Sequence, residues 1–385
     1  MDSSLMSVDM LNYTTANPGG SAALPAVHQV NVFYAIFYPT LIIVTSIMNL
    51  ATIGAFWKLR SLREKPSELF ILNLACADLL TGMVLLPFGS FLYITPGYWP
   101  TGETGCIVTV ALFNLSIHGS LFGLTTISVD RFLLVYMEYP QYIKKVTRAK
   151  VYKVIATGWV FVVVTIVIEL SLWNVAKDID ESARNIPFDF VCLSPARRVR
   201  AFSLTFFLIL YFCPVTIVCI MSAAFLYQLR KRLQKNSSRR KQTIRQGTSS
   251  TSGPGETTMT SQIELKSTST GDDLDEKSGH KTKTKNKSTG SHLDRVTRNR
   301  YVKPGITLIG LVVAMASCML PYCFYVLITE SGCERCNNTK VLFGLLVLQF
   351  CNACLDPFIY VLTRRKVRQF YKSIFLKIKC CTCTN

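Results

Sequence analysis

The chain has 385 residues, of which 50% are hydrophobic, and its formal net charge is +19 at pH 7. A soluble chain of this length would divide into about two or three domains. The apolar composition, with a mean hydropathy of +0.31, instead indicates a membrane protein. The excess of basic residues would also suit a nucleic-acid-binding protein, so its distribution along the chain has to be considered.

Seven apolar runs are long enough to cross a bilayer, and they predict an all-α bundle of seven transmembrane helices. We name them spans one to seven, and they are expected at 33–57, 69–93, 104–135, 152–175, 201–228, 305–329 and 341–362. Most of the 42 Lys and Arg residues lie in alternate connections between the runs, and none precedes Lys58. The positive-inside rule makes these connections cytoplasmic and places the N-terminus outside. The basic charge therefore reflects topology and attraction to anionic lipid, not nucleic-acid binding.

The composition predicts four regions. Residues 1–32 are polar and are expected to form an extracellular tail, and residues 33–364 form the seven-transmembrane domain. This domain is interrupted by residues 229–303, where Ser, Thr, Lys and Gly predict a disordered third cytoplasmic loop whose basic flanks extend spans five and six. In residues 365–385, apolar residues three and four apart predict a short amphipathic helix on the inner leaflet, followed by a Cys-rich tail.

Two kinds of covalent modification are predicted. Asn12 and Asn337 begin Asn-X-Thr sequons in segments expected outside the cell, so both are candidates for glycosylation. Cys380 and Cys381 are expected at the inner membrane surface, where palmitoylation would hold the amphipathic helix against the membrane.

Four cysteines are expected outside or at the outer membrane boundary. Oxidising conditions there favour a disulfide between Cys106 and Cys192 and a second between Cys333 and Cys336. The alternative for the second pair is half of a metal site, but that would need a further pair of ligands on the same face.

Several polar or helix-breaking residues lie inside the spans. Asp78 is ionisable and near mid-bilayer, which makes it a functional-site hypothesis, and the alternative is a structural carboxyl hydrogen-bonded by Asn49. Pro214, Pro321 and Pro357 remove backbone hydrogen bonds and kink their helices. Such hinges suit a helix that swings outward better than a rigid pore or anchor.

Span four and the loop after it carry further polar residues. Trp159 is expected to pack against span two, and Glu169 is expected to reach the membrane interface near the outer end of the span. Beyond span four, Arg197, Arg198 and Arg200 either attract an anionic or peptidic ligand or simply form a solvated helix start.

Residues from every span together resemble the rhodopsin-like (class A) G-protein-coupled receptors, over about residues 33–380. The matching residues are Asn49, Asp78, Cys106, Asp130-Arg131-Phe132, Trp159, Pro214, Pro321 and Asp356-Pro357-Phe358-Ile359-Tyr360. Spans two and three are most similar to biogenic-amine receptors. The resemblance implies a plasma-membrane receptor that binds an extracellular ligand in the outer half of the bundle. It would activate a heterotrimeric G protein through outward movement of span six, with arrestin and receptor kinases as further partners.

Two internal sites are implied by the resemblance. At the cytoplasmic mouth, Asp130 would restrain the switch residue Arg131 beside Phe132 at rest, and Tyr360 would swing inward on activation. Deeper in the bundle, four residues resemble the family's sodium pocket: Asp78, Ser120, Asn352 and Asp356. Two carboxylates in a low dielectric need a cation or a proton, so Asp78 would bind Na⁺ at rest. No other cofactor is expected.

The expected ligand cavity is aromatic and mostly apolar. Its residues are Phe113, Asn114, Ile117, Phe206, Phe207, Leu210, Met319, Tyr322 and Phe350. Phe113 occupies the position of the amine-binding aspartate, so an ammonium would be desolvated there without compensation, and an ordinary amine ligand is disfavoured. Asn114 and His118 are the polar groups of this cavity; His118 is interpreted as a hydrogen-bonded core residue, and the alternative is a ligand contact.

Three departures from the family pattern predict a loose resting state with signalling in the absence of ligand. Met319 replaces the usual Trp of span six, Tyr301 stands where amine receptors carry Glu, and Ser222 replaces the supporting Tyr of span five.

Other classes of membrane protein are less consistent with the sequence. A seven-helix transporter or a photoreceptor-like protein would need a carboxylate relay or a Schiff-base lysine, but the deep carboxylates expected are Asp78 and Asp356, and Phe350 stands at the lysine position. A membrane enzyme would need a nucleophile or metal constellation, which the 4 His residues do not supply. The chain is therefore not expected to be an enzyme.

Overall fold

A computed structural model of the chain describes residues 32–88, 90, 102–179, 199–249, 298–330, 333, 336 and 338–382. Throughout this described part, the regular structure is helical, and 7 helices are long and apolar enough to cross a membrane. These segments are Ala35–Lys58, Glu68–Phe88, Gly102–Tyr136, Arg148–Trp173, Ala201–Lys235, Arg300–Thr329 and Gly344–Thr363. Each of them coincides with one predicted span, which confirms the all-α seven-helix bundle.

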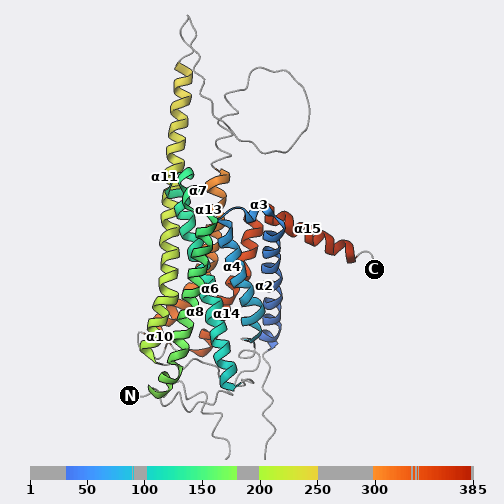
Figure 1. The fold of residues 1–385 in the computed structure, drawn as a ribbon, viewed down its shortest axis with the longest axis vertical. Coiled ribbons are helices and arrows are strands. Elements are labelled where there is room, and N and C mark those ends of the chain that lie inside the picture. Colours follow the sequence, from blue (N-terminus) through green and yellow to red (C-terminus); the bar gives the residue numbers. More distant parts are fainter. Residues whose placement is uncertain are drawn as a thin grey trace, which may run out of the picture.

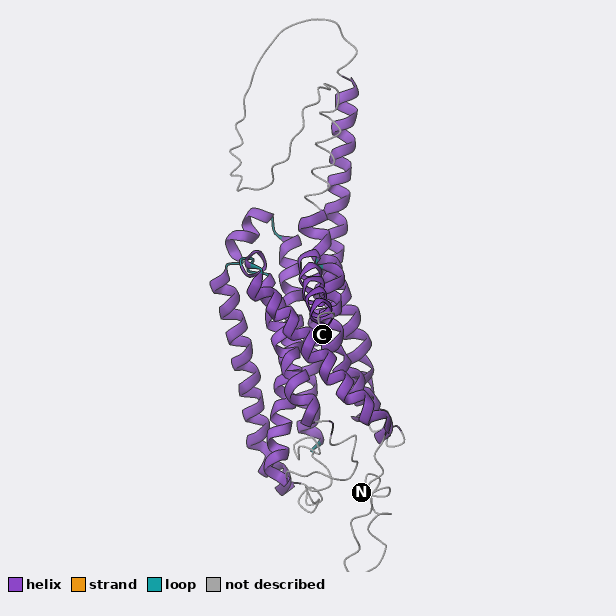
Figure 2. Ribbon diagram, turned by 90° about the vertical axis from the view of Figure 1, so that its right-hand side faces the viewer, coloured by secondary structure: helices purple, strands orange, loops and turns teal. Residues whose placement is uncertain are grey.

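The spanning helices run side by side along one direction (Figures 1 and 2). They are α2 (Val32–Lys58), α4 (Glu68–Leu80) continued by η1 (Thr81–Leu85), α6 (Gly102–Tyr136), α8 (Arg148–Ile179), α10 (Arg200–Phe207) joined through η3 (Leu208–Phe212) to α11 (Cys213–Ser249), η4 (Arg298–Val302) leading into α13 (Lys303–Glu330), and α14 (Thr339–Thr363). Three short helices, α3 (Arg60–Arg63), α7 (Tyr139–Lys145) and α15 (Arg365–Thr382), lie at one end. We call this end the α15 end and the opposite end, where α10 begins, the α10 end.

The helix α6 lies inside the bundle, in contact with α4, α8, α11 and α13. It is also mostly buried, so most of the polar side chains on α6 meet other side chains and not lipid. The switch residues and the deep polar residues predicted from the sequence are therefore placed in the interior, where their partners decide what they do.

The predicted third cytoplasmic loop begins later than expected. Helix α11 continues through residue 229 to Ser249, and Figure 1 shows its yellow end extending well past the bundle. Residues 229–249 are rich in Arg, Lys and Gln, which favour helix, and extending an existing helix needs no new nucleation. The basic flank that was predicted to extend span five is thus helical, and the helix continues beyond that flank to Ser249. Residues 250–297 of the predicted loop lie outside the described residues.

Two spans accommodate a proline through a wide helical turn. The π-helical segments η1 and η3 end just before Pro87 and Pro214. A proline ring clashes with the carbonyl four residues earlier, here those of Met83 and Leu210, and both carbonyls lie inside the wide turns. The wider turn gives the ring room, so both helices continue past the proline.

Helices α6 and α8 approach closely where Trp159 meets Gly119. The Trp159 Nε1–H donates to Oδ1 of Asn73 at 2.8 Å, which ties α8 to α4 and confirms the expected packing against span two. A Cβ atom placed on Gly119 would lie 2.7 Å from Cη2 of this anchored ring.

Gly119→Val is therefore expected to destabilise the bundle by about 1–3 kcal/mol, because the anchored ring of Trp159 cannot move away without losing its hydrogen bond. The measurement is the Tm of the purified chain in detergent. Gly344→Val is the matched control, since a Cβ at Gly344 meets no atom within 4 Å. Equal Tm values for the two variants would contradict the expectation.

The predicted amphipathic helix is present as α15, which leaves the bundle beside α2 and α3 (Figure 1). The Tyr371 hydroxyl donates to the carbonyl of Met48 and lies 2.7 Å from the hydroxyl of Thr52, which fastens α15 to α2. Burial raises the pKa of Tyr371 to about 12, so the phenol keeps the proton that it donates.

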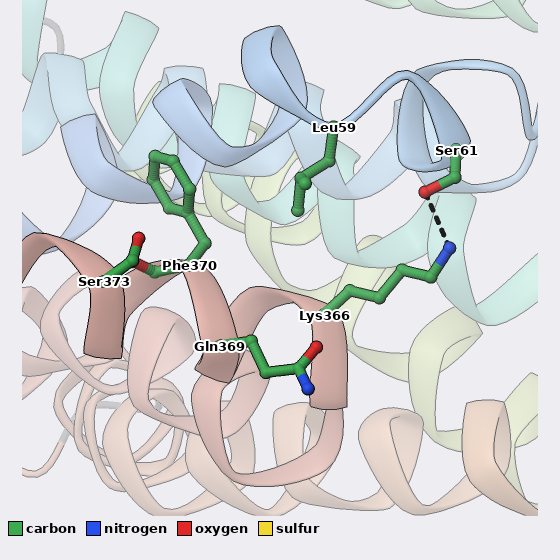
Figure 3. Close-up of a pocket in the computed structure, with 6 residues that line it drawn as sticks. All are labelled: Leu59, Ser61, Lys366, Gln369, Phe370 and Ser373. Carbon is green, nitrogen blue, oxygen red and sulfur yellow. Dashed lines mark hydrogen bonds between the residues drawn. The ribbon is translucent and has the colours of Figure 1, made fainter.

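A cavity of about 360 Å³ lies between α15 and the connection from α2 to α3 (Figure 3). It is lined by Leu59, Ser61, Lys366, Gln369, Phe370 and Ser373. Inside it the Lys366 ammonium donates to the Ser61 hydroxyl at 2.7 Å. This contact is a second attachment between α15 and the bundle.

Candidate functional site

The predicted switch residues form a buried ionic cluster at the α15 end. Arg131 is 3% exposed, and its Nη1 lies 3.4 Å from Oδ2 of Asp130. From α7, the Tyr142 hydroxyl donates to Oδ1 of Asp130 at 2.7 Å. Burial, together with the charge of Asp130, raises the pKa of Tyr142, so the phenol remains a donor. The remaining switch residues are close by: Phe132 stacks on Tyr136 and Tyr360 is fully buried.

Sequence reasoning missed a second ion pair in this cluster. Glu68, only 5% exposed at the start of α4, accepts a hydrogen bond from Nη1 of Arg364 at 2.8 Å. The carboxylate also stabilises the positive charge of Arg131 electrostatically. Burial lowers the pKa of Arg364, and the negative charge of Glu68 opposes that effect. Arg364, which directly precedes α15, is thus paired with a carboxylate from α4, and Arg131 of α6 lies within electrostatic reach of the same carboxylate.

Glu68→Gln is expected to weaken the restraint on Arg131 and to raise ligand-independent nucleotide exchange several-fold. It should also destabilise the chain by ~3–5 kcal/mol, because Arg364 would remain buried without its counter-charge. Exchange in membranes and the Tm of purified protein measure the two effects. The matched control is Glu64→Gln, which breaks the exposed Arg60–Glu64 pair, and such pairs contribute little. Identical behaviour of the two variants would refute the role of Glu68.

Tyr301 lies at the α15 end next to a cation. Nη2 of Arg232 in α11 donates to the carbonyl of Met137 at 2.6 Å, and its guanidinium lies 5.5 Å from the centre of the Tyr301 ring. Arg232 thereby connects the end of α6 to spans five and six. Ser222, at the position of the missing span-five Tyr, is buried.

The four predicted sodium-site residues come together in the middle of the bundle. Asp78, Ser120, Asn352 and Asp356 are all buried, and the Ser120 hydroxyl donates to Oδ1 of Asp78 at 3.0 Å. The other oxygens of Asp78, Asn352 and Asp356 receive no hydrogen bond from a described donor group, and the carboxyl groups of Asp78 and Asp356 lie within hydrogen-bonding reach of each other. Such a group of carboxylate and amide oxygens fits the oxygen ligands that hard cations require.

The alternative interpretation of Asp78 required a hydrogen bond from Asn49. Asn49 instead donates to the backbone carbonyls of Thr45 and Ala353, both at 3.0 Å. Asn49 therefore joins α2 to α14, and the carboxylate of Asp78 is left to the residues of the predicted sodium site.

The predicted ligand-cavity residues lie together in the α10 half of the bundle. Ile117, Phe207, Leu210, Met319, Tyr322 and Phe350 belong to the buried apolar cluster that runs through the bundle, with Phe113 and Phe206 packed against it. The ring of Tyr211 links two of them, because it lies 6.2 Å from that of Phe207 and 5.9 Å from that of Tyr322. The rings of Phe113 and Phe350 meet edge to face at a centroid distance of 6.0 Å. His118 is buried in the same region, as expected for a core residue, and its ring lies 5.1 Å from that of Tyr211.

Glu169 does not reach the membrane interface as predicted. It is 1% exposed, and its Oε2 accepts a hydrogen bond from Nδ2 of Asn114 at 2.6 Å. Helix α8 turns this side chain toward α6, where a polar partner is available, and not toward lipid. The bundle therefore holds a third deep carboxylate besides Asp78 and Asp356, and this one lies among the predicted ligand residues.

A sequence profile of the family described as "7 transmembrane receptor (rhodopsin family)" matches residues 48–360. The chain belongs to this family. The D(1) dopamine receptor of Carassius auratus is 26% identical over 363 residues, which cover 92% of this chain and 91% of that receptor. The alpha-1D adrenergic receptor of Sus scrofa is 26% identical over 323 residues, 83% of this chain and 52% of that receptor. The D(1)-like dopamine receptor of Takifugu rubripes is 29% identical over 216 residues, 54% of this chain and 46% of that receptor.

Membership of the rhodopsin family makes the chain a G-protein-coupled receptor that signals through G proteins, and not an enzyme. The family and the apolar helices together make it a multi-pass protein of the plasma membrane. The resemblance seen in the sequence is thus confirmed at the level of the family.

The described residues of this rhodopsin-family chain include some of the predicted disulfide and modification sites. Cys333 and Cys336 form a disulfide with their Cα atoms 5.3 Å apart, as predicted. Cys106 is disulfide-bonded and fully buried, but its predicted partner Cys192 lies outside the described residues. Asn12 and Asn337 also lie outside them, and Cys380 and Cys381 lie in α15. Glycosylation and palmitoylation stay predictions.

Proposed function

We propose that this receptor binds an extracellular ligand in its α10 half and activates a heterotrimeric G protein at its α15 end. The distribution of Lys and Arg supports this orientation, since the basic connections gather at the α15 end and would be cytoplasmic. The observation that carries the proposal is the position of Arg131, which is buried at this end and paired with its own neighbour Asp130 at 3.4 Å. A guanidinium held this way can exchange one partner for another at modest cost.

The proposed activation is a movement of α13. Ligand binding among the aromatic residues of the α10 half would shift α13, which contains Pro321 and can bend there. Its α15 end would then move outward and open a cavity beside Arg131, into which Tyr360 turns. Arg131 would leave Asp130 and meet the G protein. Arrestin and receptor kinases would recognise the same open form.

We further propose that Na⁺ favours the resting form. Asp78, Ser120, Asn352 and Asp356 would hold the ion, whose positive charge would offset the two buried carboxylates. Loss of the resting arrangement of these residues during activation would release it.

The ligand is proposed to be held differently from that of an ordinary amine receptor. Phe113 stands where such receptors carry an aspartate, so α6 supplies no carboxylate at that position. That the relatives named above are dopamine and adrenergic receptors nevertheless favours a small organic ligand over a peptide.

Guanine-nucleotide exchange in membranes from cells that express the chain tests the proposal. We expect exchange above that of membranes from non-expressing cells when a mixture of G proteins is supplied, in darkness as well as in light. The second candidate, a seven-helix transporter or photoreceptor-like protein, predicts no exchange in darkness. Equal exchange with and without the chain, in the presence of each G-protein class and a broad ligand panel, would refute the receptor function.

A further inference from the structure

The α10 half contains a buried carboxylate that the family resemblance does not account for. Oε2 of Glu169 in α8 lies 2.6 Å from Nδ2 of Asn114 in α6. Asn114 directly follows Phe113, the position at which an amine-binding aspartate would stand. The negative group that α6 lacks is therefore supplied from the neighbouring helix, next to the same part of the predicted cavity.

Aromatic rings continue from this carboxylate across the bundle. His118 lies one helical turn from Asn114 on the same face of α6, and its ring is 5.1 Å from that of Tyr211. Tyr211 in turn lies 5.9 Å from Tyr322 of α13. A path lined by polar and aromatic groups thus runs from α8 to α13, the helix that is proposed to move.

The chemistry of this path favours one class of ligand. A buried carboxylate offsets its desolvation best when it meets a cation, and aromatic faces accept an aryl ring and attract an adjacent ammonium. A protonated arylalkylamine carries both groups on a short linker. An ammonium bound beside Phe113 would then be compensated after all, by Glu169.

We propose that Glu169 is the counter-charge for a protonated arylalkylamine whose ring packs against Tyr211 and Tyr322. The inference rests on the proposed function, because it assumes that the α10 half is the ligand site. Binding releases Glu169 from Asn114 and lets the ligand contact α8 and α13 at once, so the ligand can bias the position of α13.

The test is ligand binding to the purified full-length chain, read from the shift in Tm with ligand concentration. The probes are dopamine, tyramine and tryptamine, each beside its neutral alcohol analogue. Glu169→Gln keeps the shape and a hydrogen bond but removes the charge, so amine affinity should fall by about 100-fold while the weak binding of the alcohols stays unchanged. The matched control is Glu103→Gln, which removes another carboxylate of the α10 half, to which Trp173 Nε1 donates at 2.8 Å. It should leave amine affinity within about threefold.

Glu169→Asp separates the charge of this side chain from its length. It keeps the negative charge on a shorter side chain, so the chain should still bind the amines more tightly than the alcohols, whereas Glu169→Gln should not. This variant also decides the matter if Glu169→Gln does not fold. The proposal is overturned if no amine binds the wild-type chain, if Glu169→Gln keeps its amine affinity, or if Glu169→Asp no longer prefers the amines to the alcohols. Binding is measured without a G protein, so each of these failures is distinct from a failure of nucleotide exchange, which would refute the proposed function.

Discussion

Arg131→Ala is expected to reduce nucleotide exchange to the level of membranes that lack the chain, with and without ligand. The guanidinium is buried beside Asp130 in the resting form, and in the proposed mechanism it is the group that contacts the G protein. Because Met319, Tyr301 and Ser222 depart from the family pattern, we expect the wild-type chain to show exchange without ligand. A loss of this ligand-independent exchange in Arg131→Ala can therefore be measured without a known ligand.

The variant Arg131→Lys refines this expectation. Lysine keeps the charge but loses the planar fork of donors, so exchange should fall to an intermediate level. Arg60→Ala serves as the matched control, because Arg60 is an exposed arginine paired with Glu64 at the same end. Exchange in Arg131→Ala equal to that of the wild-type chain, at equal surface expression, would show that Arg131 is not the switch.

Asp78→Asn is expected to abolish the effect of Na⁺ on ligand-independent exchange. In the wild-type chain, raising NaCl at constant ionic strength should lower exchange several-fold, because the ion stabilises the resting arrangement of Asp78 and Asp356. Replacing one of the two carboxylates with a neutral amide of the same shape removes most of the attraction for the cation. The measurement is exchange as NaCl replaces choline chloride.

Ser120→Ala is expected to weaken the response to Na⁺ less than Asp78→Asn does. It removes one oxygen that lies 3.0 Å from Oδ1 of Asp78 and keeps both carboxylates, so the response should need more Na⁺ but should survive. If Asp78→Asn responds to Na⁺ as the wild-type chain does, the sodium site lies elsewhere or does not exist.

The spans could be predicted from the sequence because length and apolar composition are local properties. The same holds for residues that carry a family motif, and the sequence placed Asp130, Arg131, Asp78 and Asp356 in clusters that the structure brings together. In these cases the motif itself indicates which residues lie close together in the fold.

The pairs Glu68–Arg364 and Glu169–Asn114 could not be predicted. Glu68 and Arg364 are separated by 296 positions along the chain, and neither belongs to a motif. Glu169 lies near the end of a span, where either the interface or the interior is available to a carboxylate. Which one it reaches depends on the rotation of α8 against α6, and that rotation is set by packing such as the contact between Trp159 and Gly119. The signal that could have identified Glu169 is the cost of a carboxylate inside an apolar span, whereas Glu68 lies just before the predicted span two and carried no such signal.

The proposed activation requires α13 to move away from its neighbours, and a reversible cross-link tests this movement directly. A Cβ at Gly310 would lie 3.8 Å from Cβ of Ile359 in α14, the separation that a disulfide requires. Gly310 lies on the α15 side of Pro321, about 16 Å along the helix, within the part that must swing.

The chain with Gly310→Cys and Ile359→Cys should be oxidised in membranes, and nucleotide exchange should be compared before and after reduction. The single variants, treated identically, control for the other cysteines. We predict that the cross-linked chain loses exchange and that the reductant restores it. Exchange by the cross-linked chain at the rate of its reduced form would contradict the proposed activation.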